Sequence, residues 1–363
     1  MVDNQNKKHL VVMANGLFGK ASNWDVVIDN LQKVLDTSQT LLVASDANSL
    51  MQTFDGIDSC GDRLAAEVLQ KAKEYPSLEK ISLLGHSMGG LLVRYAAGKL
   101  YDPVTCLICG LIPAHFITLA TPHMGCDGEG PAQVPFIGWT GEVPVVGHSI
   151  QRLLQSVAKP FVATFMKRTG QQFFMHDTEE HRQPLLVRMS QDSAENGYFL
   201  AALNSFVTRT CYANAGGDHL VGWANSSIRH PDELPVISPG TRLRGVIRED
   251  PLPAALHPRH AEAFSKHAAD RDIRGAAPGV AQSPAEQQQS FADASQAGPM
   301  QHQIDVSFQH SSMPFFAHNH IQVTRKWLNW EGAPVCQHLA QQLADMEKDE
   351  FIQQMMGTAR SDL

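Results

Sequence analysis

The sequence lacks the features that place a chain in a membrane or outside the cell. No apolar run in its 363 residues approaches the ~18 residues that a membrane-spanning helix needs. The N-terminus, MVDNQNKKHLVVM, has one short apolar segment and no cleavage site of small residues, so it does not resemble a secretory signal. Six cysteines are too few for a disulfide framework in a chain of this length. These absences predict an intracellular protein that is cytoplasmic or peripheral on a membrane surface, and not secreted.

Basic clusters and metal-binding patterns are also missing. The net charge is −8 and the Lys and Arg residues are scattered, which argues against nucleic acid as a partner. Cys106 and Cys109 form a CxxC, but no second CxxC or paired HxxxH completes a zinc site, so we expect buried structural thiols. We predict no metal and no organic cofactor.

What the sequence does contain is an alternation of apolar strands and amphipathic helices. HLVVMANG, TLLVASD, KISLLGHS and HFITLATPHMG predict strands, and segments between them such as NWDVVIDNLQKVL show helical spacing. NGYFLAALNSF, TRTCYANA, HQIDVSF and PVCQHLAQQLADMEKDEFIQQM continue with a helix, two strands and a last helix. The predicted class is α/β, with a mostly parallel, doubly wound sheet and helices on both faces.

Two segments interrupt this alternation inside one expected domain of residues 1–363. Residues 246–300 are rich in Ala, Gln, Pro and Ser and poor in aromatics, which predicts a disordered insertion. Residues 126–182 predict a cap, because an excursion of this size between core elements more often covers an active site than joins the sheet.

The 126–182 excursion carries an apolar stripe at helical spacing, and two roles remain open for it. One is a helix buried on the core, and the other is a cap whose apolar face meets acyl chains or a membrane surface. In the second case, basic side chains nearby would face lipid head groups. The apolar residues are Ile150, Leu153, Leu154, Val157, Phe161 and Phe165, and the basic ones are Lys159, Lys167 and Arg168.

The stretch GHSMG, residues 85–89, lies between a predicted strand and a predicted helix. It matches GxSxG, which in this context indicates a nucleophile elbow with Ser87 as the nucleophile. Gly85 and Gly89 leave room for a tight turn, and the following helix presents free backbone donors to an anion. The alternative is a glycine-rich turn without chemistry.

A serine nucleophile needs a histidine base and an acid that orients it. In α/β-hydrolases the chain order is serine, acid, histidine. YANAGGDHLVG places Asp218 in a turn after a strand, and PFFAHNHIQV places His318 and His320 after another. Spacing alone leaves the choice between the two histidines open.

An oxyanion hole needs two backbone donors beside the nucleophile. Met88 supplies the first, and the segment MANGLFG points to Leu17 as the second, with Gly16 allowing close approach. Asn15 stands where many lipases carry a histidine, and we expect it to brace this loop by hydrogen bonding.

Taken together, HLVVMANGLFG, TFDGID, GHSMGGLLVRY, LATPHMG, YANAGGDHLVGW and AHNHIQV resemble the "putative serine esterase", lipase-like family of α/β-hydrolases, in its plant and algal branch. The resemblance implies an α/β-hydrolase fold, hydrolysis of carboxylic esters and acyl-lipid substrates. By position it implies Ser87 as nucleophile, Asp218 as acid and His318 as base.

Four further residues are expected beside the substrate, namely Asn15, Gly16, His86 and His123. For the two histidines, packing is the alternative role. Three functions therefore compete: a lipid-ester hydrolase, an acyltransferase or thioesterase with the same triad, and a catalytically silent binding protein that keeps the fold.

Overall fold

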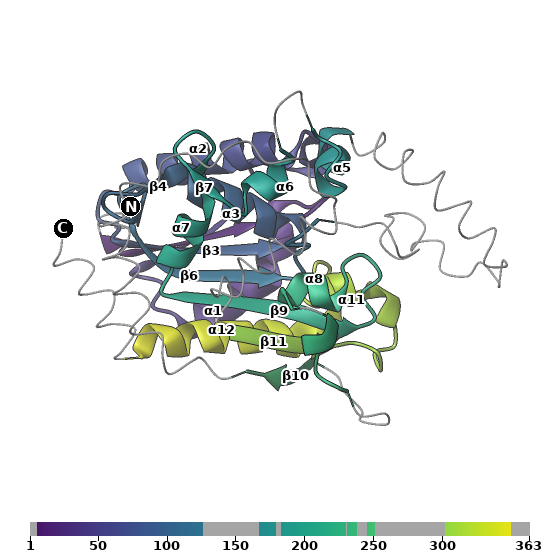
Figure 1. Ribbon diagram of the computed structural model, residues 1–363. Coiled ribbons are helices and arrows are strands. Elements are labelled where there is room, and N and C mark those ends of the chain that lie inside the picture. The colour runs from purple at the N-terminus through teal and green to yellow at the C-terminus, as the bar shows by residue number, and fades with distance from the viewer. Residues whose placement is uncertain are drawn as a thin grey trace.

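A single main sheet forms the centre of the molecule (Figure 1). The computed structural model describes residues 6–125, 167–178, 183–229, 231–237, 245–250 and 302–349. The strands of the sheet lie in the order β10 (Gly245–Glu249), β11 (His302–Ser307), β9 (Thr208–Gly216), β6 (Ile112–Leu119), β3 (Lys80–His86), β1 (His9–Ala14) and β2 (Thr40–Ala44). All neighbouring pairs are parallel except β10 with β11. The predicted mostly parallel sheet is confirmed.

Helices cover both faces of the sheet (Figure 1). One face packs against α1 (Asp25–Val34) and α12 (Ala333–Lys348), and the other against α2 (Ile57–Glu74), α3 (Met88–Leu100) and α7 (Phe199–Ser205). Successive side chains of a strand point to opposite faces, so Val11 joins the first cluster while Leu10 and Val12 join the second. Both faces of the central strands bury mostly apolar side chains, which is why these strands read as nearly continuous hydrophobic runs.

Short elements connect these layers. The helices are α5 (Lys167–Phe173), α6 (Leu185–Arg188), α8 (Trp223–Ser227) and α11 (Ala317–His320), and the 3-10 turns are η2 (Ala21–Trp24), η3 (Leu50–Phe54), η5 (Pro231–Glu233), η6 (Pro314–Phe316) and η7 (Trp330–Gly332). Two small hairpin sheets pair β4 (Tyr101–Asp102) with β5 (Leu107–Ile108) and β7 (Asp192–Ser193) with β8 (Gly197–Tyr198).

The strand order reverses direction between β1 and β3. From β1 the chain crosses to β2 on one side, and it then returns to β3 on the other side of β1. In parallel sheets, functional loops gather at the carboxyl ends of the strands where the strand order reverses. Gly16 follows β1 and Ser87 follows β3, so the candidate site lies at this end of the sheet.

The end of the predicted cap is bound to the core. The apolar stripe between residues 150 and 165 lies outside the described residues, but α5 packs on η3 and α2. Arg168 was expected to face lipid head groups. Its guanidinium instead engages the Asp58 carboxylate, with Nε 3.1 Å from Oδ1, because that carboxylate lies on the helix against which α5 packs.

The segment predicted as an insertion begins within a strand of the main sheet. Residues 246–249 belong to β10, whose backbone pairs with β11 at the edge of the sheet. The strand segment GVIRE has only two β-branched residues, so its local signal was lost beside the polar stretch that follows. Residues 251–300 lie outside the described residues, but Asp250 N–H donates to Gln303 O at 3.0 Å. The two ends of that segment therefore meet.

The remaining expectations concern cysteines and membrane spans. Cys106 and Cys109 are free thiols, the first buried and the second half-buried, and burial raises the pKa of Cys109 to about 11. Among the described helices, none is both long and apolar enough to cross a membrane.

Candidate active site

Ser87 lies in a strained turn between β3 and α3. Its φ of 55° and ψ of −130° belong to a backbone region that residues with a side chain rarely adopt, as expected of a nucleophile elbow. Glycines make the turn sterically accessible. A Cβ on Gly85 would lie 2.4 Å from the Gly90 backbone, and one on Gly89 would lie 2.1 Å from the Ala14 carbonyl oxygen. Ser87 itself is partly exposed, while the residues on both sides of it are buried.

Asp218 follows β9 and has every acceptor position of its carboxylate occupied. Oδ1 accepts the backbone N–H groups of Leu220 and Val221 at 2.9 and 3.0 Å, and Oδ2 accepts Asn214 Nδ2 at 2.8 Å. Oδ2 also lies 3.0 Å from His318 Nδ1. Burial by itself would raise the pKa of Asp218, but His318 and these hydrogen bonds outweigh it and hold the pKa below its usual range. The carboxylate is therefore charged at neutral pH.

His318 lies in α11, just beyond β11, and its ring is turned toward the acid. Its Nδ1 contacts Asp218, which leaves Nε2 as the atom that can exchange a proton with a nucleophile. His320 is fully buried, and its Nε2 lies 2.9 Å from Met313 O. The structure thus brings Asp218 and His318 together and holds His320 elsewhere. Among the described residues, Ser87 makes no hydrogen bond with His318.

The loop after β1 passes directly over the serine. A Cβ on Gly16 would lie 2.6 Å from Ser87 Cβ and 3.0 Å from its Oγ, so only glycine allows this approach. The backbone N–H groups of Leu17 and Met88 make no hydrogen bond within the described part of the chain. Two backbone donors are thus available beside Ser87, as an oxyanion hole requires.

His86 and His123 are both buried, with only 5% and 2% of their surface exposed. Their expected place beside the substrate stays a prediction. His86 Nε2 lies 2.7 Å from the His318 carbonyl oxygen, and His123 Nε2 lies 3.0 Å from Thr118 Oγ1. Burial lowers the pKa of each to about 3, which keeps both rings neutral near pH 7.

The hydrogen bonding of Asn15 and Asn214 differs from what the sequence predicted. Asn15 was expected to brace the loop by hydrogen bonding, but its buried amide has no partner within the described residues, and the side chain packs where Gly19 leaves room. Asn214 was missed, although it hydrogen bonds to Asp218 and so orients the carboxylate. The only local signal was its position at the end of a strand, four residues before the acid.

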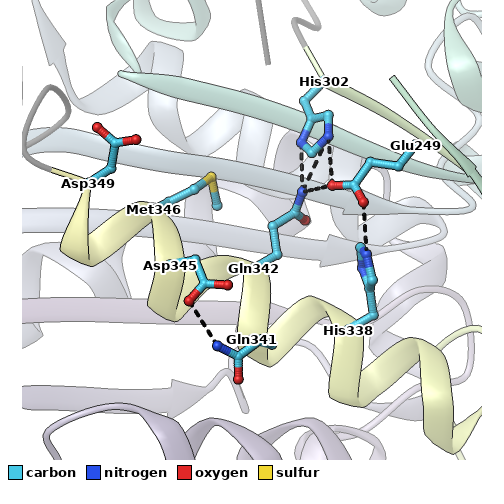
Figure 2. Close-up of a pocket in the computed structure, with 8 residues that line it drawn as sticks. All are labelled: Glu249, His302, His338, Gln341, Gln342, Asp345, Met346 and Asp349. Carbon is cyan, nitrogen blue, oxygen red and sulfur yellow. Dashed lines mark hydrogen bonds and ion pairs between the residues drawn. The ribbon is translucent and has the colours of Figure 1, made fainter. Parts of the chain in front are cut away.

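A separate cavity of about 300 Å³ lies between α12 and the strands β10 and β11 at the edge of the sheet (Figure 2). In it the Glu249 carboxylate lies 3.1 Å from His302 Nε2 and 3.2 Å from His338 Nε2. Its lining residues are Glu249, His302, His338, Gln341, Gln342, Asp345, Met346 and Asp349. No group of three or more metal-ligating side chains with suitable geometry occurs among the described residues, here or at the elbow.

The sheet order, the strained serine after the third strand of the chain and the loop above it define an α/β-hydrolase fold. Residues 4–228 match the family described as "Putative serine esterase (DUF676)", and the chain belongs to this family.

Curated relatives carry lipase names. The chain is 28% identical over 251 residues to "Putative lipase ROG1" of Saccharomyces cerevisiae, covering 68% of this chain and 32% of that protein. It is 27% identical over 234 residues to "Putative lipase C4A8.10" of Schizosaccharomyces pombe, covering 61% and 26%. The chain therefore spans about a third or less of the length of these two relatives.

Solved structures include two distant likenesses. A lipase-esterase related protein from Clostridium acetobutylicum is 11% identical, with 58% of this chain and 76% of that chain covered and a TM-score of 0.29. A Trichoderma reesei cutinase in complex with a C11Y4 phosphonate inhibitor is 17% identical, with 45% and 79% covered and a TM-score of 0.25.

Proposed function

We propose that the protein is a serine hydrolase that cleaves carboxylic esters of acyl lipids through an acyl-enzyme. Ser87 is the nucleophile, His318 the base and Asp218 the acid that orients it. The observation that carries the proposal is the pairing of His318 with the fully hydrogen-bonded carboxylate of Asp218. The backbone of His318 also contacts His86, the residue before Ser87. Membership of a serine esterase family and the lipase names of the relatives support the reaction class.

In the first half of the reaction, Ser87 Oγ attacks the ester carbonyl and His318 Nε2 takes the hydroxyl proton. Asp218 accepts the Nδ1–H of the resulting imidazolium. The N–H groups of Leu17 and Met88 stabilise the oxyanion. The carbon–oxygen bond to the leaving alcohol then breaks, and His318 returns the proton to that oxygen. The Ser87–His318 hydrogen bond forms as substrate enters, since such bonds are often poorly aligned in a ligand-free site.

In the second half, water replaces the alcohol. His318 takes a proton from the water as its oxygen bonds to the acyl carbon, and it then protonates Ser87 Oγ as the acyl–serine bond breaks. The products are a carboxylic acid and the regenerated enzyme. An acyltransferase would bring a second alcohol to the same step, and a thioesterase would release a thiol in the first half, so the acceptor and the leaving group distinguish these alternatives.

The direct test is labelling with a fluorophosphonate, which reacts with an activated serine. We expect the wild type and Ser38→Ala, a surface serine control, to be labelled, and Ser87→Ala to be unlabelled with an unchanged thermal midpoint. Absence of labelling in the folded wild type would favour a silent binding protein. Lipid profiling after incubation with the purified protein then identifies the head group and acyl chain that are cleaved.

The sequence of residues 126–182 supports a second part of the proposal, peripheral contact of a cap with a lipid surface. Its apolar stripe suits such contact, although a helix buried on the core would carry the same pattern. Leu154→Asp combined with Phe161→Asp should weaken binding to liposomes and turnover of long-chain esters but spare a short soluble ester. Equal loss on both substrates would favour the buried helix.

A further inference from the structure

His86 joins the strand of the nucleophile to the segment that carries the base. It is the last residue of β3 and is bonded covalently to Ser87, while its Nε2 lies 2.7 Å from the carbonyl oxygen of His318. The two histidines are 232 positions apart in the sequence. Their ring centroids are 4.9 Å apart, with the planes inclined by 48°. One side chain therefore contacts both the backbone and the ring of the base.

The His318 carbonyl has no partner from its own helix. The backbone donors that could reach it are the N–H groups of Ile321 and Gln322. Ile321 N–H donates to Ala317 O instead, and Gln322 N–H does not donate to the His318 carbonyl. A helix leaves its last carbonyls without partners unless another group supplies a donor. Here His86 supplies it, in a buried place where an unpaired carbonyl would destabilise the segment.

The contact also fixes the tautomer of the neutral His86 ring. A carbonyl oxygen only accepts, so the Nε2 of His86 must carry the proton and donate it. Burial, followed by the neighbouring charge of His318, lowers the pKa of His86 to about 3, while Asp218 acts in the opposite direction. His86 therefore stays neutral near pH 7. It adds no second positive charge beside His318 when that ring becomes protonated.

We propose that His86 is a positioning residue, which holds His318 in register with Ser87 through its hydrogen bond to the His318 carbonyl. The proposal rests on the proposed function, because the position of the His318 ring relative to Ser87 affects a reaction only if these two side chains exchange a proton. Ser87 and His318 come from distant parts of the chain, and a shift of about 1 Å between reacting groups lowers a rate about 100-fold. The tilted ring contact further limits rotation of the imidazole away from Asp218.

Two substitutions separate the donor from the ring. His86→Phe keeps an aromatic ring beside His318 but removes the hydrogen bond, whereas His86→Gln keeps an N–H donor without the ring. For a short soluble ester, we expect His86→Phe to lower kcat by about 10- to 100-fold with KM unchanged within about twofold. His86→Gln should recover most of kcat. His9→Phe is the control for a lost buried histidine, because His9 is equally buried but lies at the opposite end of the sheet.

A second readout does not depend on activity. Imidazole NMR of the Ser87→Ala protein should show the His318 Nδ1–H that is bonded to Asp218. In the Ser87→Ala background, His86→Phe should broaden or shift this resonance, while His86→Gln should leave it nearly unchanged.

The kinetic and NMR measurements distinguish failure of the proposed hydrolase function from failure of the positioning role of His86. If the wild type hydrolyses no ester, the proposed function fails and the NMR comparison still decides whether His86 positions His318. A folded His86→Phe protein with wild-type kcat and an unchanged His318 resonance would overturn the positioning role. A parallel fall of kcat in His86→Phe and His9→Phe, with no change in the resonance, would show a general loss of stability and overturn it as well.

Discussion

Replacing Asp218 by asparagine should abolish most turnover while leaving the fold nearly intact. The new side chain has the same shape, but one carboxylate oxygen becomes an NH2 group. If that group stood at Oδ1, it would face the two backbone N–H donors of Leu220 and Val221 and leave both unpaired. Each unpaired buried donor costs about 1–3 kcal/mol, so this orientation is disfavoured.

With the NH2 group at Oδ2 instead, the neighbours can adapt. Asn214 donates to this position through Nδ2, and its own Oδ1 is buried without a partner within the described residues, so a flip of the Asn214 amide turns it into an acceptor. His318 can likewise accept at Nδ1 if it moves its proton to Nε2. Stability then changes by no more than about 1–2 kcal/mol. The base, however, now carries a proton on the atom that must accept one from Ser87.

The expected result is a fall in kcat of about 10⁴-fold, the scale for a triad whose histidine is held in the wrong tautomer. Hydrolysis of a short soluble ester measures kcat, and thermal unfolding measures stability. Asp46→Asn is the matched control, because Asp46 is exposed at the edge of the sheet and should retain full activity. A loss of less than about tenfold in a folded Asp218→Asn protein would refute the assigned role of Asp218.

Three further predictions follow from the geometry. Gly16→Ala should lower kcat by at least about tenfold, because its Cβ would lie 2.6 Å from that of Ser87; wild-type kinetics would show that the loop can move aside. Replacing residues 251–300 by a two-residue Asn-Gly turn should leave the thermal midpoint and activity close to wild type, since the ends of that segment already meet; insoluble protein would contradict this. Burial lowers the pKa of His9 and His123 to about 3, so the unfolded chain takes up protons below pH 6.5 before the folded one does. Each should therefore remove about 1 kcal/mol of stability between pH 6.5 and 5.5, and a urea midpoint that is constant or rises in this range would count against neutral buried rings.

The sequence by itself determined the order of elements and the place of the candidate nucleophile. Apolar runs with period two and helices with period 3.6 are local patterns, and they predicted the strand before Ser87 and the helix after it. Glycine is also a local signal, because Gly85 and Gly89 mark places where the backbone approaches other chain segments at distances that a side chain would block. The order of serine, acid and histidine along the chain was also visible in the sequence, because it matches the order found in α/β-hydrolases.

Only the tertiary structure decided which polar groups meet. The family resemblance implied His318 rather than His320 as the partner of Asp218, but the two residues lie 100 positions apart and no periodic pattern records such a pair. The contacts of Asn214 with Asp218 and of His86 with His318 were missed for the same reason, since a single polar side chain in a turn or at a strand end carries no information about its partner. These hydrogen bonds are set by the strand order, which brings the carboxyl ends of β3, β9 and β11 to one edge of the sheet and buries the loops that follow them.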